Sequence, residues 1–172
     1  MTLNVARSPD PRLWLNYDPD TGVFVWKAAF GKAKIGAVAG TPSAKGYLVI
    51  GVQGRRFLAH RLAWMFVFGA MPNGQLDHID GNPANNRIAN LREATNSQNH
   101  GNRGPSRAST SGVKGVYWWK TGQKWKEQLV HQGRSYFIGY FSTREAAADA
   151  YDRAERRIRG EFAFASRRRE AA

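Results

Sequence analysis

Cysteine is absent from this chain of 172 residues. The absence excludes a disulfide framework and a thiolate zinc site, so any bound metal must be held by oxygen or imidazole ligands. No apolar run approaches the roughly 20 residues that a membrane helix needs, and the amino-terminal residues do not read as a secretory signal. The sequence therefore predicts no membrane partner and a cytoplasmic location.

Acidic residues are scarce relative to basic ones. The chain has 26 Lys and Arg against 13 Asp and Glu, which gives a formal net charge of +13, and the excess is shared by the segments before and after Pro105. A polyanion would neutralise such a surface, so nucleic acid is the leading expected partner. A generally basic solvated surface, a membrane-surface protein and a ribosomal protein are the alternatives. Hydrophobic residues make up 42% of the chain, which indicates folded structure.

The amino-terminal half predicts short strands and one helix. The letters LWLNYDPDTGVFVW at 13–26 place a Pro-Asp-Thr-Gly turn between two apolar runs, which is typical of a hairpin. Two more strands are expected on either side of Gln53 and Gly54. The run AHRLAWMFVF at 59–68 predicts a helix that ends at Gly69.

The carboxy-terminal half predicts three strands followed by one helix. Gly, Pro, Ser, Thr and Arg dominate NRGPSRASTSG, and we expect an interdomain linker at 105–111. Strands are predicted at 115–119, 124–130 and 134–141. The letters STRE from Ser142 to Glu145 predict a capping box at the start of a helix, and Gly160 predicts its end.

The segment 77–102, DHIDGNPANNRIANLREATNSQNHGN, is dense in His, Asp and Asn. It predicts a strand, a turn-rich loop, a second strand and a short helix capped by Thr95. Phosphodiester hydrolysis needs a base that activates water and a cation that neutralises charge on the phosphate. Asp77 offers a hard oxygen ligand for Mg²⁺ and His78 can be the base. Successive strand side chains point to opposite faces, so the strand must end or bend here.

These residues resemble the HNH, or ββα-metal, nuclease motif in its phage homing-endonuclease variant. The resemblance covers Leu76 to Asn102, with HRLAW upstream in the same order. It implies that Asp77 and Asn99 hold one Mg²⁺, with Mn²⁺ as a possible substitute, and that no small-molecule cofactor is used. It also implies that His78 is the general base, that Asn90 hydrogen-bonds His78 and fixes its orientation, and that the products carry 5′ phosphate and 3′ hydroxyl groups.

Three arginines of this half are candidate phosphate contacts: Arg61, Arg87 and Arg92. Asn86 could also touch the DNA backbone. The alternative for His60 and Arg61 is a structural role, which the sequence favours. Asp80 and Gly81 are expected to form a tight turn and not a calcium loop, because the acids of such a loop are missing.

The segment 112–164 resembles the DNA-binding domain of the plant ethylene-response-factor, or APETALA, family. The residues that carry the resemblance are Gly115 and Val116, Trp125, IGYF at 138–141 and EAAADAYDRAERRIRGEFA at 145–163. The resemblance implies a sheet whose outward side chains contact double-stranded DNA. The candidate contacts are Lys114, Tyr117, Trp119, Lys126, Gln128, Arg134 and Phe137. Aromatic residues replace several family arginines, so the family's base preference does not transfer. A core or protein interface is the alternative, above all for Trp118 and Trp125.

Together these features predict an α+β protein: small amino-terminal strands with a ββα-metal HNH motif, joined to a three-stranded antiparallel sheet packed on one α-helix. The predicted parts are a nuclease domain at 1–104, a linker at 105–111, a DNA-binding domain at 112–166 and a basic tail at 167–172. The expected function is metal-dependent cleavage of duplex DNA, by nicking or double-strand cutting. Removal of 105–172 should relax site choice and spare basal chemistry. A catalytically idle DNA-binding or regulatory protein is the alternative.

Overall fold

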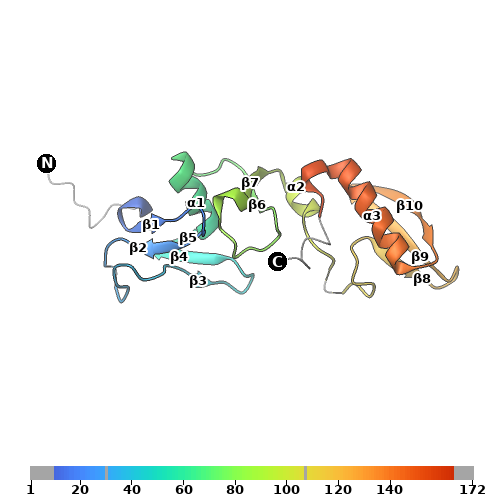
Figure 1. Cartoon of the computed structure of the whole chain (residues 1–172), viewed down its shortest axis with the longest axis horizontal. Helices are drawn as coiled ribbons and strands as arrows, with labels where there is room; N and C mark the ends of the chain where they lie inside the picture. The colour runs from blue at the N-terminus through green and yellow to red at the C-terminus, as the bar shows by residue number, and fades with distance from the viewer. Residues whose placement is uncertain (1–9, 30, 107, 165–172) are drawn as a thin grey trace. The chain divides into compact units, whose positions relative to one another are not determined.

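The structure is a computed structural model that describes residues 10–29, 31–106 and 108–164. It divides the chain into two compact units, residues 1–93 and 94–172. The fold is mixed α+β with several small sheets, as the sequence predicts (Figure 1). The predicted basic tail at 167–172 lies outside the described residues. No described helix has the length and apolar character needed to cross a membrane.

The first unit is built from short antiparallel strands and one helix. Its elements are η2 (Pro11–Leu13), β1 (Leu15–Tyr17), β2 (Phe24–Trp26), β3 (Thr41–Pro42), β4 (Leu48–Val52), β5 (Arg55–Leu58), α1 (Ala59–Phe68), β6 (Gln75–His78), η3 (Ile88–Asn90) and β7 (Leu91–Ala94). β1 pairs with β2, and β3, β4 and β5 form one sheet in that order. β6 and β7 form a separate two-stranded sheet.

The predicted turns and helix of this unit are confirmed. Gly22 closes the β1–β2 turn at φ 74°, and Gln53 and Gly54 connect β4 to β5 with positive φ values of 50° and 74°. α1 ends at Gly69, which adopts the left-handed conformation that glycine accepts without strain. Phe24, Ile50 and Leu62 lie in the buried core that joins the strands to α1.

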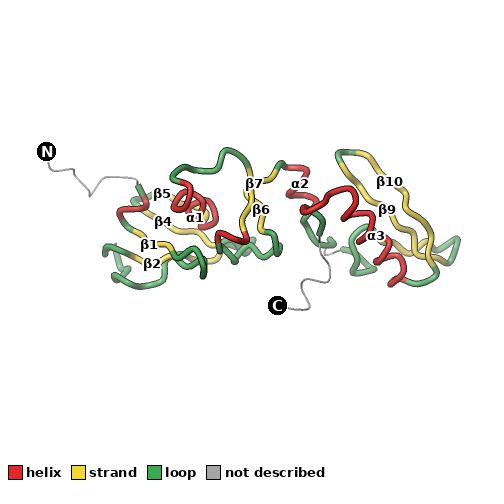
Figure 2. Tube along the Cα trace, turned by 45° about the horizontal axis from the view of Figure 1, so that its top comes forward, coloured by secondary structure: helices red, strands yellow, loops and turns green. Residues whose placement is uncertain are grey.

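The second unit contains α2 (Asn96–Gly101), β8 (Val116–Trp119), β9 (Lys124–His131), β10 (Arg134–Phe141), α3 (Arg144–Arg159) and η4 (Gly160–Phe162). The three strands form an antiparallel sheet with β9 in the centre, and α3 packs on it (Figure 2). Leu129 and Val116 are buried from the sheet, and Ala147 and Ala150 from the helix. This confirms the predicted sheet and helix.

Three details differ from the sequence predictions. Residues 88–90 form a 3₁₀ turn before β7 and are not part of the strand. The α3 cap is Thr143 and not Ser142, because the Thr143 hydroxyl accepts the Ala146 N–H at 3.2 Å. The compact units divide at residue 93, earlier than the predicted linker at 105–111, because α2 packs with η4. The division of labour between the two halves stays a prediction.

Candidate active site

Strand β6 carries Asp77 and His78, and both side chains are buried, with 3% and 6% exposure. The strand ends at His78, where the Gly81 N–H donates to the His78 carbonyl at 2.8 Å. Ile79 N donates to the Asn90 carbonyl at 2.9 Å and joins this turn to the η3–β7 segment. Two neighbouring strand side chains can serve one site only if the strand ends or bends between or beside them, and β6 ends at His78.

Two aromatic side chains enclose the His78 imidazole. The His60 ring centroid lies 5.0 Å from that of His78 with the planes at 81°, and the Tyr47 ring lies 6.0 Å from His78. Burial, together with the charges of His78 and Arg61, lowers the pKa of His60 to about 4. His60 is therefore neutral at pH 7. Nothing in the sequence singles out Tyr47. Its position in the structure, beside His60 and His78, identifies it as part of the site.

His78 has the protonation behaviour of a base that works at neutral pH. Burial lowers the pKa of its imidazole below the ordinary value, and the Asn86 amide, Asp80 and Asp77 oppose this lowering without cancelling it. An imidazole with a lowered pKa is unprotonated at pH 7 and can accept a proton from water.

The asparagine whose side chain raises the pKa of His78 is Asn86, and the role expected for Asn90 in orienting His78 stays a prediction. The Asn90 amide is bound elsewhere: its Nδ2 donates to Asp80 Oδ1 at 3.0 Å and to the Asn85 carbonyl at 2.9 Å, and its Oδ1 accepts the Asp80 N–H at 3.0 Å. Asn86 is only 2% exposed. The sequence does not show that Asn86 is the buried one of the two adjacent asparagines, Asn85 and Asn86. Only the fold shows which side chain points inward.

Asp80 organises the loop that follows His78. Its carboxylate accepts the Asn82 N–H at 2.8 Å, Asn85 Nδ2 at 2.7 Å and Asn90 Nδ2 at 3.0 Å. Burial alone would raise the pKa of Asp80, but these hydrogen bonds outweigh it and hold the pKa below its ordinary value. Gly81 adopts a φ of 69°. Asp80 and Gly81 thus have the turn-forming role that the sequence predicts.

Asp77 forms an ion pair with Arg92. Asp77 Oδ2 accepts Arg92 Nε at 2.9 Å and Nη2 at 2.7 Å, and the two side chains are 4% and 14% exposed. The guanidinium therefore lies inside the protein on a carboxylate, which corrects the expectation that Arg92 contacts DNA phosphate. A metal ion held by Asp77 would share this carboxylate with Arg92.

The donor chemistry at β6 fits a divalent cation of the magnesium type. Asp77 supplies a carboxylate oxygen, and Mg²⁺ takes few protein ligands and keeps several waters. Within the described segments there is no group of three or more His, Asp or Glu that could hold a metal ion by itself. An ion at Asp77 would therefore depend on an amide ligand and on water or phosphate oxygens.

Asn99, the second expected metal ligand, lies in α2. Thr95 caps this helix and forms a capping box with Gln98, which confirms the predicted cap. Asn99 belongs to the second compact unit and Asp77 to the first. Their convergence on one ion stays a prediction.

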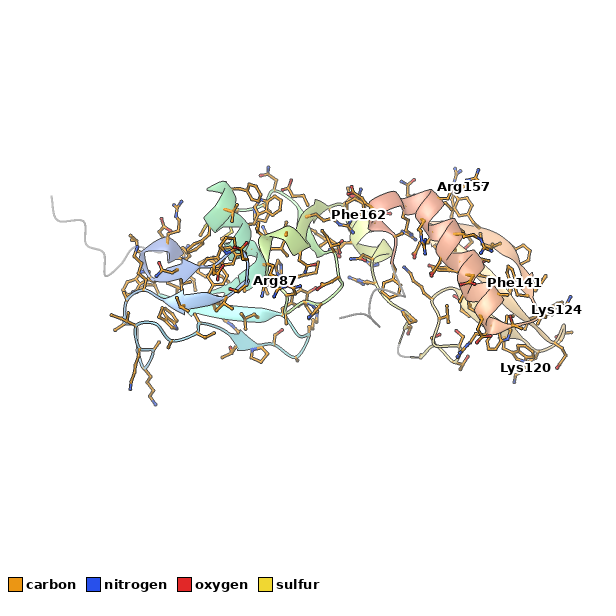
Figure 3. The ribbon with its side chains drawn as sticks, viewed as in Figure 1. Arg87, Lys120, Lys124, Phe141, Arg157 and Phe162 are labelled. Carbon is orange, nitrogen blue, oxygen red and sulfur yellow. The ribbon has the colours of Figure 1, made fainter. Side chains whose placement is uncertain are left out.

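The other two candidate phosphate contacts of the first unit, Arg61 and Arg87, differ in their surroundings. Arg61 Nη1 and Nη2 donate to the carbonyls of Gly74 and Pro72, both at 3.0 Å. These bonds hold the loop between α1 and β6, which gives Arg61 a structural role, and its contact with phosphate stays a prediction. The Arg87 side chain is exposed at the surface of the first unit (Figure 3). Its contact with DNA phosphate stays a prediction.

One of the expected DNA contacts of the second unit is turned inward. Lys114 Nζ donates to Glu155 Oε1 at 2.8 Å and to the Gly101 carbonyl, and its side chain is 19% exposed. This ion pair corrects the outward position expected for Lys114. Arg159 also pairs with Glu155, at 3.3 Å, and its side chain is 7% exposed.

The other candidate DNA contacts of the second unit are not engaged in this way. The structure leaves four of them exposed: Tyr117, Trp119, Arg134 and Phe137. Lys126 and Gln128 are half-buried on β9. Their contact with DNA stays a prediction.

Comparison with known proteins agrees with the position of this site. The sequence profile of a family described as HNH endonuclease matches residues 57–100, from the end of β5 through α2. No solved structure matches the chain significantly.

Two viral proteins are similar over about the same length. Protein 3.8 of Escherichia phage T7 is 34% identical over 105 residues, which are 60% of this chain and 86% of the phage protein. A protein of Acanthamoeba polyphaga mimivirus, described as an uncharacterized HNH endonuclease, is 33% identical over 106 residues, which are 60% of this chain and 54% of the viral protein.

Proposed function

We propose that this chain, whose residues 57–100 match the HNH endonuclease family, is a metal-dependent endonuclease that hydrolyses phosphodiester bonds of DNA. The expected substrate is duplex DNA, cut on one or both strands, and the expected biological setting is that of a phage homing endonuclease. The observation that carries the proposal is the buried imidazole of His78 at the end of β6, next to the carboxylate of Asp77.

His78 is the proposed general base. Its lowered pKa keeps the ring unprotonated at pH 7, so it can take the proton of the attacking water as the water oxygen bonds to phosphorus. His60 and Tyr47 limit the positions of the ring, and the Asn86 side chain raises its pKa against the lowering caused by burial. These contacts support a base that is fixed in place before substrate binds.

Asp77 and Asn99 are the proposed ligands of a divalent cation, Mg²⁺ or Mn²⁺. When bound, such an ion neutralises negative charge on the phosphate and on the leaving oxygen. Arg92 donates two hydrogen bonds to the buried Asp77 carboxylate and fixes its position.

Plasmid cleavage by the full chain tests the proposal. Cleavage should need added Mg²⁺ or Mn²⁺ and should stop with EDTA. His78→Ala should lower the rate by about 100-fold or more, because a positioned general base contributes at least that factor. Added imidazole should restore part of the lost rate. His131→Ala, in β9 and outside the site, is the matched control and should cleave at the wild-type rate.

The same assay separates the nuclease from the idle DNA-binding alternative. Gel shifts that need no metal, together with no cleavage of any DNA substrate under any divalent cation, would establish the alternative. Cleavage that His78→Ala leaves unchanged would remove His78 from the mechanism.

A further inference from the structure

The three-stranded sheet of the second unit has one face that α3 does not cover. Residues directly opposite one another in antiparallel strands point to the same face. Tyr117 and Tyr140 both pair with Lys126, and Phe137 pairs with Gln128. The buried Val116 and Leu129 alternate with these residues and lie toward α3. The outer sheet face therefore consists of Tyr117, Trp119, Lys124, Lys126, Gln128, Val130, Ser135, Phe137 and Tyr140.

Aromatic rings dominate the outer sheet face and are open to solvent. Tyr117 and Phe137 are 57% and 55% exposed, and Tyr140 and Trp119 are 44% and 39% exposed. Trp119 stacks on Tyr140 with ring centroids 4.6 Å apart, and Phe137 lies 5.0 Å from Tyr140. Contiguous exposed apolar surface of this kind marks a binding site more often than a free surface.

The charge on the outer sheet face is entirely positive. Lys124 and Lys126 stand among the rings, and Lys126 Nζ lies 6.0 Å from the centre of the Phe137 ring. None of the nine residues of this face is acidic. Lys120, in the turn between β8 and β9, adds a further cation at the same end of the sheet as Lys124 (Figure 3). The face is complementary to a polyanion that also offers flat apolar groups.

Unpaired bases fit this surface better than the major groove of an intact duplex. Groove recognition depends on side chains that form paired hydrogen bonds with base edges, mainly Arg, Asn and Gln. The outer sheet face has one such residue, Gln128, and no arginine. In a duplex the faces of the bases are already stacked on one another, whereas unpaired bases can stack on aromatic side chains.

We propose that the outer sheet face binds unpaired nucleotides of DNA, with bases stacked on Phe137 and Tyr117 and the backbone phosphates near Lys124 and Lys126. The unpaired segment would belong to the DNA on which the proposed nuclease acts, so the biological meaning of the inference rests on that function. The binding surface itself does not depend on the nuclease site, because it lies wholly within the second unit.

Equilibrium binding of the full chain in EDTA tests the inference without cleavage. The probes are a fluorescent oligothymidylate of about 12 nucleotides and a duplex of the same length. Wild type should bind the single strand more tightly than the duplex. Phe137→Ala should weaken single-strand binding on the order of tenfold, and Phe137→Trp should retain it. Phe68→Ala is the matched control, because Phe68 lies in the other unit and is 57% exposed.

Phe137→Leu separates stacking from simple apolar contact, since leucine keeps most of the bulk but has no ring. Tighter binding of the duplex by wild type, or wild-type single-strand affinity in Phe137→Leu, overturns the inference. Failure of this inference can be told apart from failure of the proposed nuclease function. His78→Ala should bind the single strand normally while it fails to cleave, and Phe137→Ala should lose binding in EDTA, where cleavage plays no part.

Discussion

Asn86 and Asn90 lie four residues apart and act on different partners. The Asn86 amide raises the pKa of His78 against the lowering caused by burial. Asn86→Ala should therefore lower the pKa of His78 further, so the acidic limb of the pH profile of kcat/KM should move to lower pH. That limb reports the base in the free enzyme. The measurement is cleavage rate at subsaturating DNA across pH 4 to pH 8, roughly the range of histidine pKa values.

Asn90→Ala is the matched comparison. Its amide bonds to Asp80 and Asn85 would be lost, which should destabilise the loop by about 1–3 kcal/mol. The acidic limb should stay where it is in wild type. If Asn90→Ala moved the limb and Asn86→Ala did not, Asn90 would be the residue that orients His78.

At the scale of single elements, β9 carries a buried carboxyl in its centre. Glu127 is 0% exposed, and neither side-chain oxygen has a hydrogen-bond partner in the part of the chain that the structure describes. Burial raises the pKa of Glu127 from 4.5 to about 7. The folded protein thus binds a proton that the unfolded chain releases between these two pKa values, and stability should fall as pH rises through this window.

Glu127→Gln should remove this dependence, because the amide is neutral at every pH. At pH 8 the variant should be more stable than wild type by about 3 kcal/mol, and near pH 4 the difference should vanish. Thermal unfolding at both pH values measures it. Glu145→Gln, at an exposed position in α3, is the control and should not change the pH dependence. An equal stability difference at both pH values would show that Glu127 does not titrate on unfolding.

The sequence was informative about elements wherever a local signal determines the backbone. The Gln53-Gly54 turn, the end of α1 at Gly69 and the three strands of the second unit follow from turn residues and alternation. Side-chain partners could not be predicted in this way. Whether Lys114 points outward or pairs with Glu155 depends on where α3 crosses the sheet, and whether Arg92 meets Asp77 depends on how β6 pairs with β7.

At the scale of the whole molecule, the main difference from the sequence-based prediction is that α2 belongs to the second compact unit and not to the first. This helix has six residues, and an isolated helix of that length is not stable in water. Within the second unit, Lys114 donates to the carbonyl of Gly101 at the end of α2. A Cβ on Gly101 would lie 2.6 Å from Arg159 Nη1, so glycine permits the close approach of the Arg159 side chain. Lys114, Arg159 and η4 therefore support the helix that contains Asn99.

Deletion of residues 105–172 should for this reason abolish cleavage and not merely relax site choice. The remaining chain keeps His78, Asp77 and Asn99 in its sequence, but α2 loses Lys114 and Arg159 and should unfold. The first unit should stay folded, since its core lies among residues 15–91. Plasmid cleavage with Mg²⁺ should fall about as far as in His78→Ala, and hydrogen exchange should show unprotected amides at 96–101 beside protected amides in β4 and α1. Full cleavage by the truncated chain would mean that α2 is held in place by the first unit alone and that the sequence-based boundary at 105–111 divides the functions correctly.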